Sequence, residues 1–171
     1  ALRRSELTSL AVGDVAFVPG RGVTVLVRRS KTDQQGRGQQ LAIWANAADP
    51  DFCPVEALRA WLALRQAPEP GAALFCAITK GGRLTGEGLS DKAVARLVKQ
   101  AAAGAGLDAA AFSGHSLRAG LMTAAAEAGA ELADLMRQSR HRSADVALGY
   151  LRPADLWRNN VTARVFAPAG K

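Results

Sequence analysis

The residues best suited to chemistry are one tyrosine, two histidines and a few cations, spread along a chain of 171 residues. Tyr150 is the only tyrosine, in the stretch ADVALGYLRP, and it follows His141 by nine positions. The other histidine, His115, stands three residues before Arg118 in HSLR, a spacing that places both on one face of a helix. Two earlier cations complete the set, namely Arg3 in ALRRSEL and Lys31 in SKTDQQG.

Together these side chains suit attack on a phosphodiester. Guanidinium and imidazole N–H donors stabilise the charge that gathers on the non-bridging oxygens in the transition state. A phenol with a pKa of about 10 is a poor nucleophile at neutral pH unless a base or nearby positive charge activates it. The arginines around Tyr150 can supply that charge, and a lysine can protonate the departing alkoxide. There is no carboxylate pair and no cluster with metal-ligand spacing, so neither a metal nor a cofactor is expected.

Each residue also has a simpler explanation. A His-x-x-Arg pair is common on helix surfaces, and a single tyrosine such as Tyr150 is usually a half-buried aromatic. Lys31 in a polar loop is most often solvated, while Arg3 and Arg4 could pair with Glu6. The joint placement of both histidines and the only tyrosine in one ordered set favours the chemical interpretation.

Composition indicates a basic globular protein. Hydrophobic residues make up 49%, and 22 Lys plus Arg against 15 Asp plus Glu give a formal charge of +7. This excess favours a polyanionic partner, and arginine, the commoner of the two cations, can grip a phosphate through two parallel donors. Cys53 and Cys76 have no close Cys or His companion, so we interpret them as buried thiols in a reducing compartment. A cytoplasmic location follows by default.

The elements that must position these residues are mainly helices with one small antiparallel sheet. Alternating apolar residues around PGRG predict a hairpin over about 14–30, and QLAIW predicts a third strand. A short apolar segment, ALFCAI, precedes the turn-like TKGGRLTGEG. Helical signals lie over 2–10, 54–66, 90–103, 115–129, 131–139 and 143–151, with a last amphipathic segment over 153–166. No internal domain boundary is indicated.

One helix start is specific enough to name its residues. Ser90 is placed to cap the helix that runs to about residue 103. The apolar stripe expected on that helix consists of Val94, Leu97, Val98 and Ala101.

The ordered set resembles the catalytic domain of the tyrosine recombinases, the phage-integrase and Xer-type family. The family pattern runs Arg, Lys, His-x-x-Arg, His or Trp, then Tyr. In this sequence the matching positions are Arg3, Lys31, His115 with Arg118, His141 and Tyr150. The resemblance covers nearly the whole chain and implies a single catalytic domain over residues 1–171, without the family's separate N-terminal core-binding domain.

The resemblance implies site-specific strand exchange on double-stranded DNA. Tyr150 is expected to attack the scissile phosphate, giving a 3′-phosphotyrosyl link and a free 5′-hydroxyl that can be resealed without ATP or metal. Arg3 and Arg118 would hold the phosphate, and His141 would donate a hydrogen bond to it. The remaining roles are proton movement at the tyrosine by His115 and protonation of the leaving oxygen by Lys31.

Two departures and one feature near the nucleophile accompany this resemblance. Arg140 stands where most family members have glycine just before the third-position histidine, and it could hinder turnover or add a phosphate contact. The absent N-terminal domain predicts weak, salt-sensitive DNA binding. Gly149 loosens the segment that carries Tyr150, consistent with a tyrosine that swings into place.

The sequence also offers candidate partner contacts and more than one interpretation of function. Candidates for contact with the DNA backbone are Arg28, Arg29, Lys92, Arg96 and Arg142, each at least as well explained as a solvated surface charge, together with Arg140. The segment over 153–166 packs either on its own core or on a neighbouring subunit of a tetramer on DNA. The alternative functions are DNA relaxation of the type IB topoisomerase kind and a catalytically inactive DNA-binding or assembly module.

Overall fold

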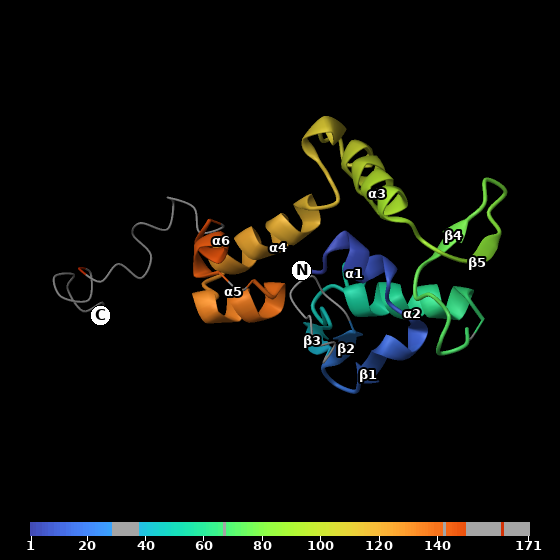
Figure 1. The fold of residues 1–171 in the computed structure, drawn as a ribbon, viewed down its shortest axis with the longest axis horizontal. Coiled ribbons are helices and arrows are strands. Elements are labelled where there is room, and N and C mark those ends of the chain that lie inside the picture. Colours follow the sequence, from blue (N-terminus) through green and yellow to red (C-terminus); the bar gives the residue numbers. More distant parts are fainter. Residues whose placement is uncertain (29–37, 67, 142, 150–161, 163–171) are drawn as a thin grey trace. The chain divides into compact units, whose positions relative to one another are not determined.

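The computed structural model describes residues 1–28, 38–66, 68–141, 143–149 and residue 162 (Figure 1). The chain forms two compact units. The first is Leu2–Gly114, and the second comprises Ala1 with residues 115–171. The expectation of one undivided domain over residues 1–171 stays a prediction.

The larger unit contains an antiparallel three-stranded sheet in the order β1-β2-β3. The unit begins with helix α1 (Arg4–Thr8) and a short 3-10 helix (Val12–Asp14). The three strands that follow are β1 (Val15–Val18), β2 (Gly22–Val27) and β3 (Gln39–Trp44). In the register, Val25 of β2 lies between Val15 and Leu41. The predicted hairpin and third strand are thereby confirmed, apart from residues 29–30 of the hairpin, which lie outside the described residues.

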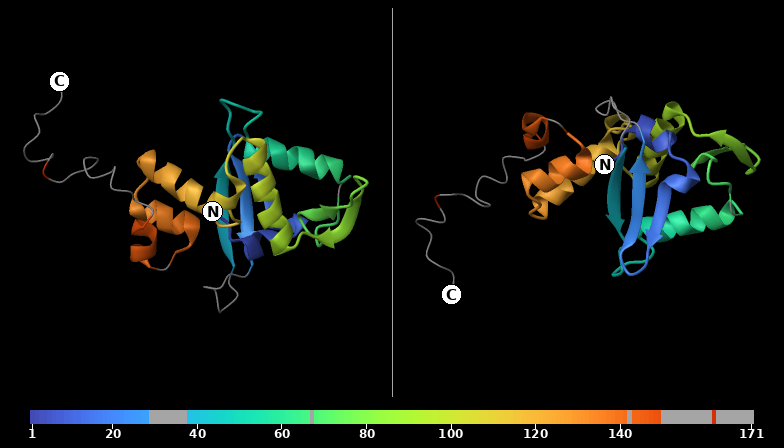
Figure 2. Two further views of the ribbon diagram at one scale, coloured as in Figure 1. Left: turned by 90° about the horizontal axis from the view of Figure 1, so that it is seen from above. Right: turned by 60° about the horizontal axis from the view of Figure 1, so that its bottom comes forward.

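One face of this sheet is buried because apolar residues alternate along β2. Its Val23 and Val25 join a core that also contains Leu10, Cys53, Val55 and Leu74. Helix α2 (Pro54–Leu64) packs leucines against this core, and Figure 2 shows the helix beside the sheet. The guanidinium of Arg59 lies 4.5 Å from the centre of the Phe17 ring, which ties α2 to β1. The helix predicted over 54–66 therefore exists and ends two residues early.

A second, two-stranded sheet follows α2. Strands β4 (Cys76–Ile78) and β5 (Leu84–Gly88) pair antiparallel. The sequence predicts only a short apolar segment and a turn here, so the second sheet is a correction. The glycines of TKGGRLTGEG hid the strand because Gly has low strand propensity.

Helix α3 (Asp91–Gly104) begins as predicted, with the Ser90 hydroxyl accepting a hydrogen bond from the Ala93 backbone N–H at 3.2 Å. The predicted stripe is partly wrong. The buried residues are Val94, Val98 and Ala102, spaced four apart, whereas Ala101 is exposed and Leu97 is 50% exposed. Leu97 instead lines a mostly apolar cavity of about 380 Å³ with Trp61 and Phe75. A second short 3-10 helix, Ala109–Ala111, follows.

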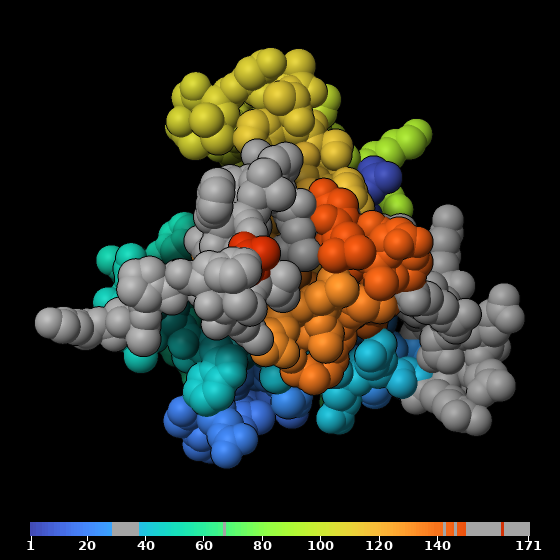
Figure 3. Space-filling model, turned by 90° about the vertical axis from the view of Figure 1, so that its left-hand side faces the viewer, coloured from blue at the N-terminus to red at the C-terminus, as the bar shows by residue number. Residues whose placement is uncertain are grey.

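The smaller unit is helical, with α4 (Ser116–Glu127), α5 (Leu132–Ser139) and α6 (Ala144–Leu148). Met122, Ala126 and Leu135 form its buried core. Figure 3 shows the surface that α5 and α6 present in orange. The three predicted helices are confirmed within the described residues, while the segment over 153–166 lies outside them apart from the exposed Thr162.

None of the helices in the described part of the chain is long and apolar enough to cross a membrane.

The fold class predicted from the sequence, mainly helical with a small antiparallel sheet (α+β), is confirmed, and the structure adds a second small sheet.

Candidate functional site

Arg118 is the centre of a polar cluster in the helical unit. It lies in the first turn of α4 and is only 3% exposed. Its Nη1 donates to the backbone carbonyl of Ala1, and its Nη2 donates to the backbone carbonyl of Ser139. The same Nη2 lies 3.0 Å from Nε2 of His141. Carbonyl oxygens fix the plane of the guanidinium without neutralising its charge, which is the state needed to bind an anion.

His141 reaches Arg118 because the chain reverses at the end of α5. Arg140, the residue after the helix, has φ 59° and ψ 38°, in the left-handed region. This conformation ends the helix and returns the next residue beside it, as glycine commonly does at helix C-termini. His141 then lies with Nδ1 2.9 Å from the hydroxyl oxygen of Ser139. Two predicted residues, Arg118 and His141, are thus brought into direct contact.

Arg140 itself is buried, with 5% of its surface exposed. From its position in the sequence, Arg140 is a candidate phosphate contact. In the structure its backbone performs the turn that glycine is expected to make at this position, at a steric cost that a Cβ brings in the left-handed region. A DNA contact by its side chain stays a prediction and requires that the side chain become accessible.

His115 occupies the position just before α4, with an exposed side chain. Arg118, three residues on, is buried. His115 thus precedes the first turn of α4, in which Arg118 lies, and the two residues differ in environment. Their common target stays a prediction.

Arg3 belongs to the other unit, where it precedes α1. Its Nη1 forms a 2.6 Å ion pair with Oε1 of Glu6, and its backbone N–H donates to Oε2 at 2.7 Å. Glu6 is 2% exposed, so the pairing offered as the simpler explanation for Arg3 is real. Both carboxylate oxygens of Glu6 are used to hold Arg3, and this makes Glu6 a positioning residue for it.

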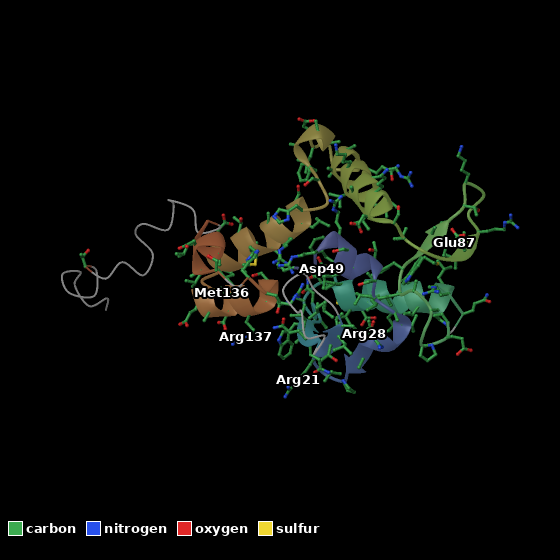
Figure 4. The ribbon with its side chains drawn as sticks, in the orientation of Figure 1. Arg21, Arg28, Asp49, Glu87, Met136 and Arg137 are labelled. Atoms are coloured by element: carbon green, nitrogen blue, oxygen red, sulfur yellow. The ribbon has the colours of Figure 1, made fainter. Side chains whose placement is uncertain are left out.

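Arg28 also has a carboxylate partner. Its Nε donates to Oδ1 of the buried Asp14 at 2.5 Å, while the arginine side chain remains largely exposed (Figure 4). Asp14 in turn accepts from the Ala11 backbone N–H at 2.9 Å. A DNA phosphate at Arg28 must therefore share the guanidinium with Asp14, and the predicted contact stays a prediction.

Helix α3 presents a basic stripe, of which the sequence predicts only part. Lys92 and Arg96 were predicted, and both are exposed. Lys99, three residues beyond Arg96, lies on the same face and is exposed as well. The helical spacing of 92, 96 and 99 was the signal that could have found it.

Four predicted site residues lie outside the described residues: Lys31, Tyr150, Arg29 and Arg142. Within the described ranges no three His, Cys, Asp or Glu side chains form a group able to hold a metal ion.

Comparison with known proteins decides the family. The model of the "Phage integrase family" matches residues 1–156. The "Integrase/recombinase xerD homolog" of Selenomonas ruminantium is 38% identical over 166 residues, covering 97% of this chain and 48% of the relative. The chain belongs to the phage integrase family.

Solved structures agree with the fold expected of this phage integrase family member. The chain resembles the XerA recombinase with a TM-score of 0.66 at 20% identity, covering 98% of this chain and 53% of that one. It resembles the XerH site-specific recombinase bound to palindromic difH substrate with a TM-score of 0.68 at 18% identity, covering 95% and 40%. The chain spans about half the length of the curated relative it matches.

Proposed function

We propose that this chain carries the catalytic part of a site-specific DNA recombinase, which cleaves and rejoins double-stranded DNA through a tyrosine. Membership of the phage integrase family supports this proposal. The observation that carries it is the buried Arg118, held in direct contact with His141. A buried cation oriented by carbonyl oxygens beside an imidazole suits a phosphate whose charge increases in the transition state.

In the proposed reaction the Tyr150 phenolate attacks the scissile phosphorus and expels the 5′-oxygen. The product is a 3′-phosphotyrosine and a free 5′-hydroxyl, with Lys31 giving a proton to the departing oxygen. Because one phosphate ester replaces another, the reverse attack by a 5′-hydroxyl reseals the strand without ATP or a metal. We assign Arg118 and Arg3 to the non-bridging oxygens, and His115 to the proton of Tyr150.

His141 would act on the same phosphate as Arg118. Its Nε2 already faces Nη2 of Arg118, so both groups can address one oxyanion. Arg3 is assigned to the same phosphate, with its guanidinium aligned by Glu6. Fixed donors cost no reorganisation when the charge develops, which is why such groups lower the barrier.

We further propose that DNA contacts run along α3, through Lys92, Arg96 and Lys99. A tetramer on DNA, joined through residues 153–166, and a cytoplasmic location complete the proposal. The XerH recombinase, whose fold this chain resembles, has been solved bound to its difH substrate in pre-cleavage and post-cleavage complexes.

Covalent capture tests the chemistry. The protein is incubated with a library of duplexes, each nicked so that the 5′-hydroxyl fragment diffuses away after cleavage. We expect a denaturation-resistant protein–DNA adduct with wild-type protein and none with Tyr150→Phe, and mass spectrometry should place the DNA on Tyr150. DNA binding with no adduct in either protein identifies the inactive binding module instead.

A plasmid assay separates recombination from relaxation. Supercoiled plasmids with and without paired copies of the captured sequence are treated alike. Recombined products that require the paired sites support the proposal. Relaxation of both plasmids at equal rates, without recombinants, identifies topoisomerase activity.

A further inference from the structure

Ser139 connects to both members of the Arg118–His141 pair. Its backbone carbonyl accepts from Nη2 of Arg118. Its hydroxyl oxygen lies 2.9 Å from Nδ1 of His141 and 3.5 Å from the backbone carbonyl of Met136. Ser139 is 0% exposed, so these contacts exclude water. A hydroxyl buried this completely needs hydrogen-bond partners, and the two contacts supply them.

The direction of each hydrogen bond follows from the donors available. A guanidinium can only donate, so Nε2 of His141 must accept from Nη2 of Arg118 and carries no proton there. The proton of the neutral ring is therefore on Nδ1, which donates to the Ser139 oxygen. The Ser139 hydroxyl then donates its own hydrogen to the Met136 carbonyl. One assignment satisfies every contact in the series.

We propose that Ser139 is a positioning residue that holds His141 by Nδ1 and so turns Nε2 toward Arg118. The proposal rests on the proposed function only where it assigns Nε2 to the scissile phosphate. When a phosphate oxygen takes the Nη2 donor, Nε2 is left facing the same oxygen and can donate to it once it binds a proton. The Nδ1–H bond to Ser139 is kept in both forms of the ring, because Nδ1 is a donor in neutral and in protonated histidine alike.

The backbone explains how a residue only two positions away can play this part. Arg140 in the left-handed region folds the chain back, so Ser139 and His141 come together across one residue. A second-sphere acceptor on one imidazole nitrogen fixes both the tautomer and the orientation of the ring. Here that acceptor is a hydroxyl rather than a carboxylate, so it orients the ring without adding negative charge beside the phosphate.

The tautomer can be read directly in the free protein, because the chain has only two histidines. Protein labelled with ¹⁵N in histidine is examined by long-range ¹H–¹⁵N correlation at a pH where the rings are neutral, and His115→Gln assigns the signals. We expect the His141 ring in the Nδ1–H form. In Ser139→Ala we expect a shift of the population toward Nε2–H, while Ser143→Ala, which removes an exposed serine two residues beyond His141, leaves it unchanged.

The conservative variant keeps this test decisive if the alanine variant folds poorly. Ser139→Thr retains the hydroxyl and should preserve the Nδ1–H form, and Ser139→Cys, similar in size but a weaker acceptor, should be intermediate. An Nδ1–H population that is the same in the alanine, cysteine and wild-type proteins would overturn the proposal. So would an Nε2–H form in the wild-type protein.

Kinetics provide the link to the reaction. We expect Ser139→Ala to slow adduct formation by roughly tenfold, the lower end of the effect of removing a hydrogen-bonded partner of a metal-ligating histidine, with DNA affinity nearly unchanged. Ser139→Thr should recover most of the rate. If wild-type protein forms no adduct, the proposed function fails, while the tautomer measurement still decides the role of Ser139. An adduct rate unaffected by Ser139→Ala contradicts the catalytic part alone.

Discussion

At the scale of single residues, Arg140 combines a strained backbone with a position next to His141. A residue with a Cβ in the left-handed region costs about 1–2 kcal/mol, which glycine does not incur. We expect Arg140→Gly to be more stable than Arg140→Ala by about 1 kcal/mol, because both remove the guanidinium and only glycine relieves the backbone. Urea unfolding of the two variants measures the difference. Equal stabilities would show that the turn is not strained.

The Arg3–Glu6 pair offers a second test, since a buried carboxylate holds a proposed phosphate-binding arginine. Glu6→Ala is expected to lower the free energy of unfolding by about 1–3 kcal/mol and to slow adduct formation, because Arg3 loses the acceptors of its side chain and backbone. Thermal melts and the covalent capture assay measure the two effects.

A matched control for this pair lies on α5. Asp134 and Arg137, the latter labelled in Figure 4, form an ion pair with the same three-residue spacing, but both side chains are well exposed. Asp134→Ala should cost less than about 0.5 kcal/mol, as exposed pairs do. A loss equal to that of Glu6→Ala would show that burial does not set the value of the Arg3 pair.

Cys53 gives a pH-dependent prediction. The backbone N–H of Glu56 lowers the pKa of the Cys53 thiol below its ordinary value, with the Asn46 N–H, 3.2 Å from the sulfur, adding to the effect. A folded-state pKa below the unfolded one adds stability that is complete above the unfolded value, about 8.5, and is lost as the pH falls through the folded value. The stability lost in Cys53→Ala should therefore grow as the pH rises toward 9. The loss in Val55→Ala, measured by the same urea titrations, should stay constant, and parallel curves for the two variants would contradict the prediction.

At the scale of elements, close approach of strands β2 and β3 depends on Gly22. A Cβ at this position would lie 2.1 Å from the Ile43 carbonyl oxygen and 2.9 Å from the Ala45 backbone nitrogen. Both atoms belong to backbone that cannot move without opening the sheet. Gly22→Ala should cost about 1–3 kcal/mol. In Gly71→Ala the added methyl meets open space, so its melting temperature should match the wild type, and two equal losses would contradict this account.

The elements that sequence patterns predicted are those with strong local signals. Alternation and the PGRG turn located β1 and β2, while Pro54 and the Ser90 cap located the starts of α2 and α3. Strands β4 and β5 were missed because they are short and glycine-rich, and pairing across the hairpin rather than local preference makes them strands. The sequence wrongly predicts that Leu97 is buried. Helical periodicity shows which face of a helix is apolar, but not how much of that face a neighbouring element covers.

For the candidate site too, the sequence predicts some of the residues and contacts and cannot predict others. The ordered histidines and arginines pointed to Arg118 and His141, which the structure brings together. Spacing alone could not indicate Ser139, because its contact with His141 needs the left-handed turn at Arg140, a conformation that sequence would assign to glycine. Nor could it show that Arg28 is paired with Asp14, since the two residues are fourteen positions apart with strands β1 and β2 between them.

At the scale of the whole molecule, the formal charge of +7 attracts any polyanion, so local contacts must be separated from net charge. The exposed stripe of Lys92, Arg96 and Lys99 makes a specific prediction. Each phosphate contact releases counterions and contributes about 0.9 to the slope of log affinity against log salt on duplex DNA. Replacing all three residues with glutamine should lower that slope by about three and weaken binding most at low salt.

The control for this prediction carries a charge change away from the stripe. Arg59 on α2 packs over Phe17 and pairs with Glu56, so Arg59→Gln removes one positive charge without touching α3. Fluorescence anisotropy with a labelled duplex at four or more salt concentrations gives the slopes, after melts confirm that each variant is folded. We expect Arg96→Gln to reduce the slope by about one and Arg59→Gln to leave it nearly unchanged, because Arg59 is already occupied by Glu56 and the Phe17 ring and is not part of the stripe. If Arg59→Gln reduces the slope as much as Arg96→Gln, the DNA is responding to net charge and the stripe on α3 is not its contact surface.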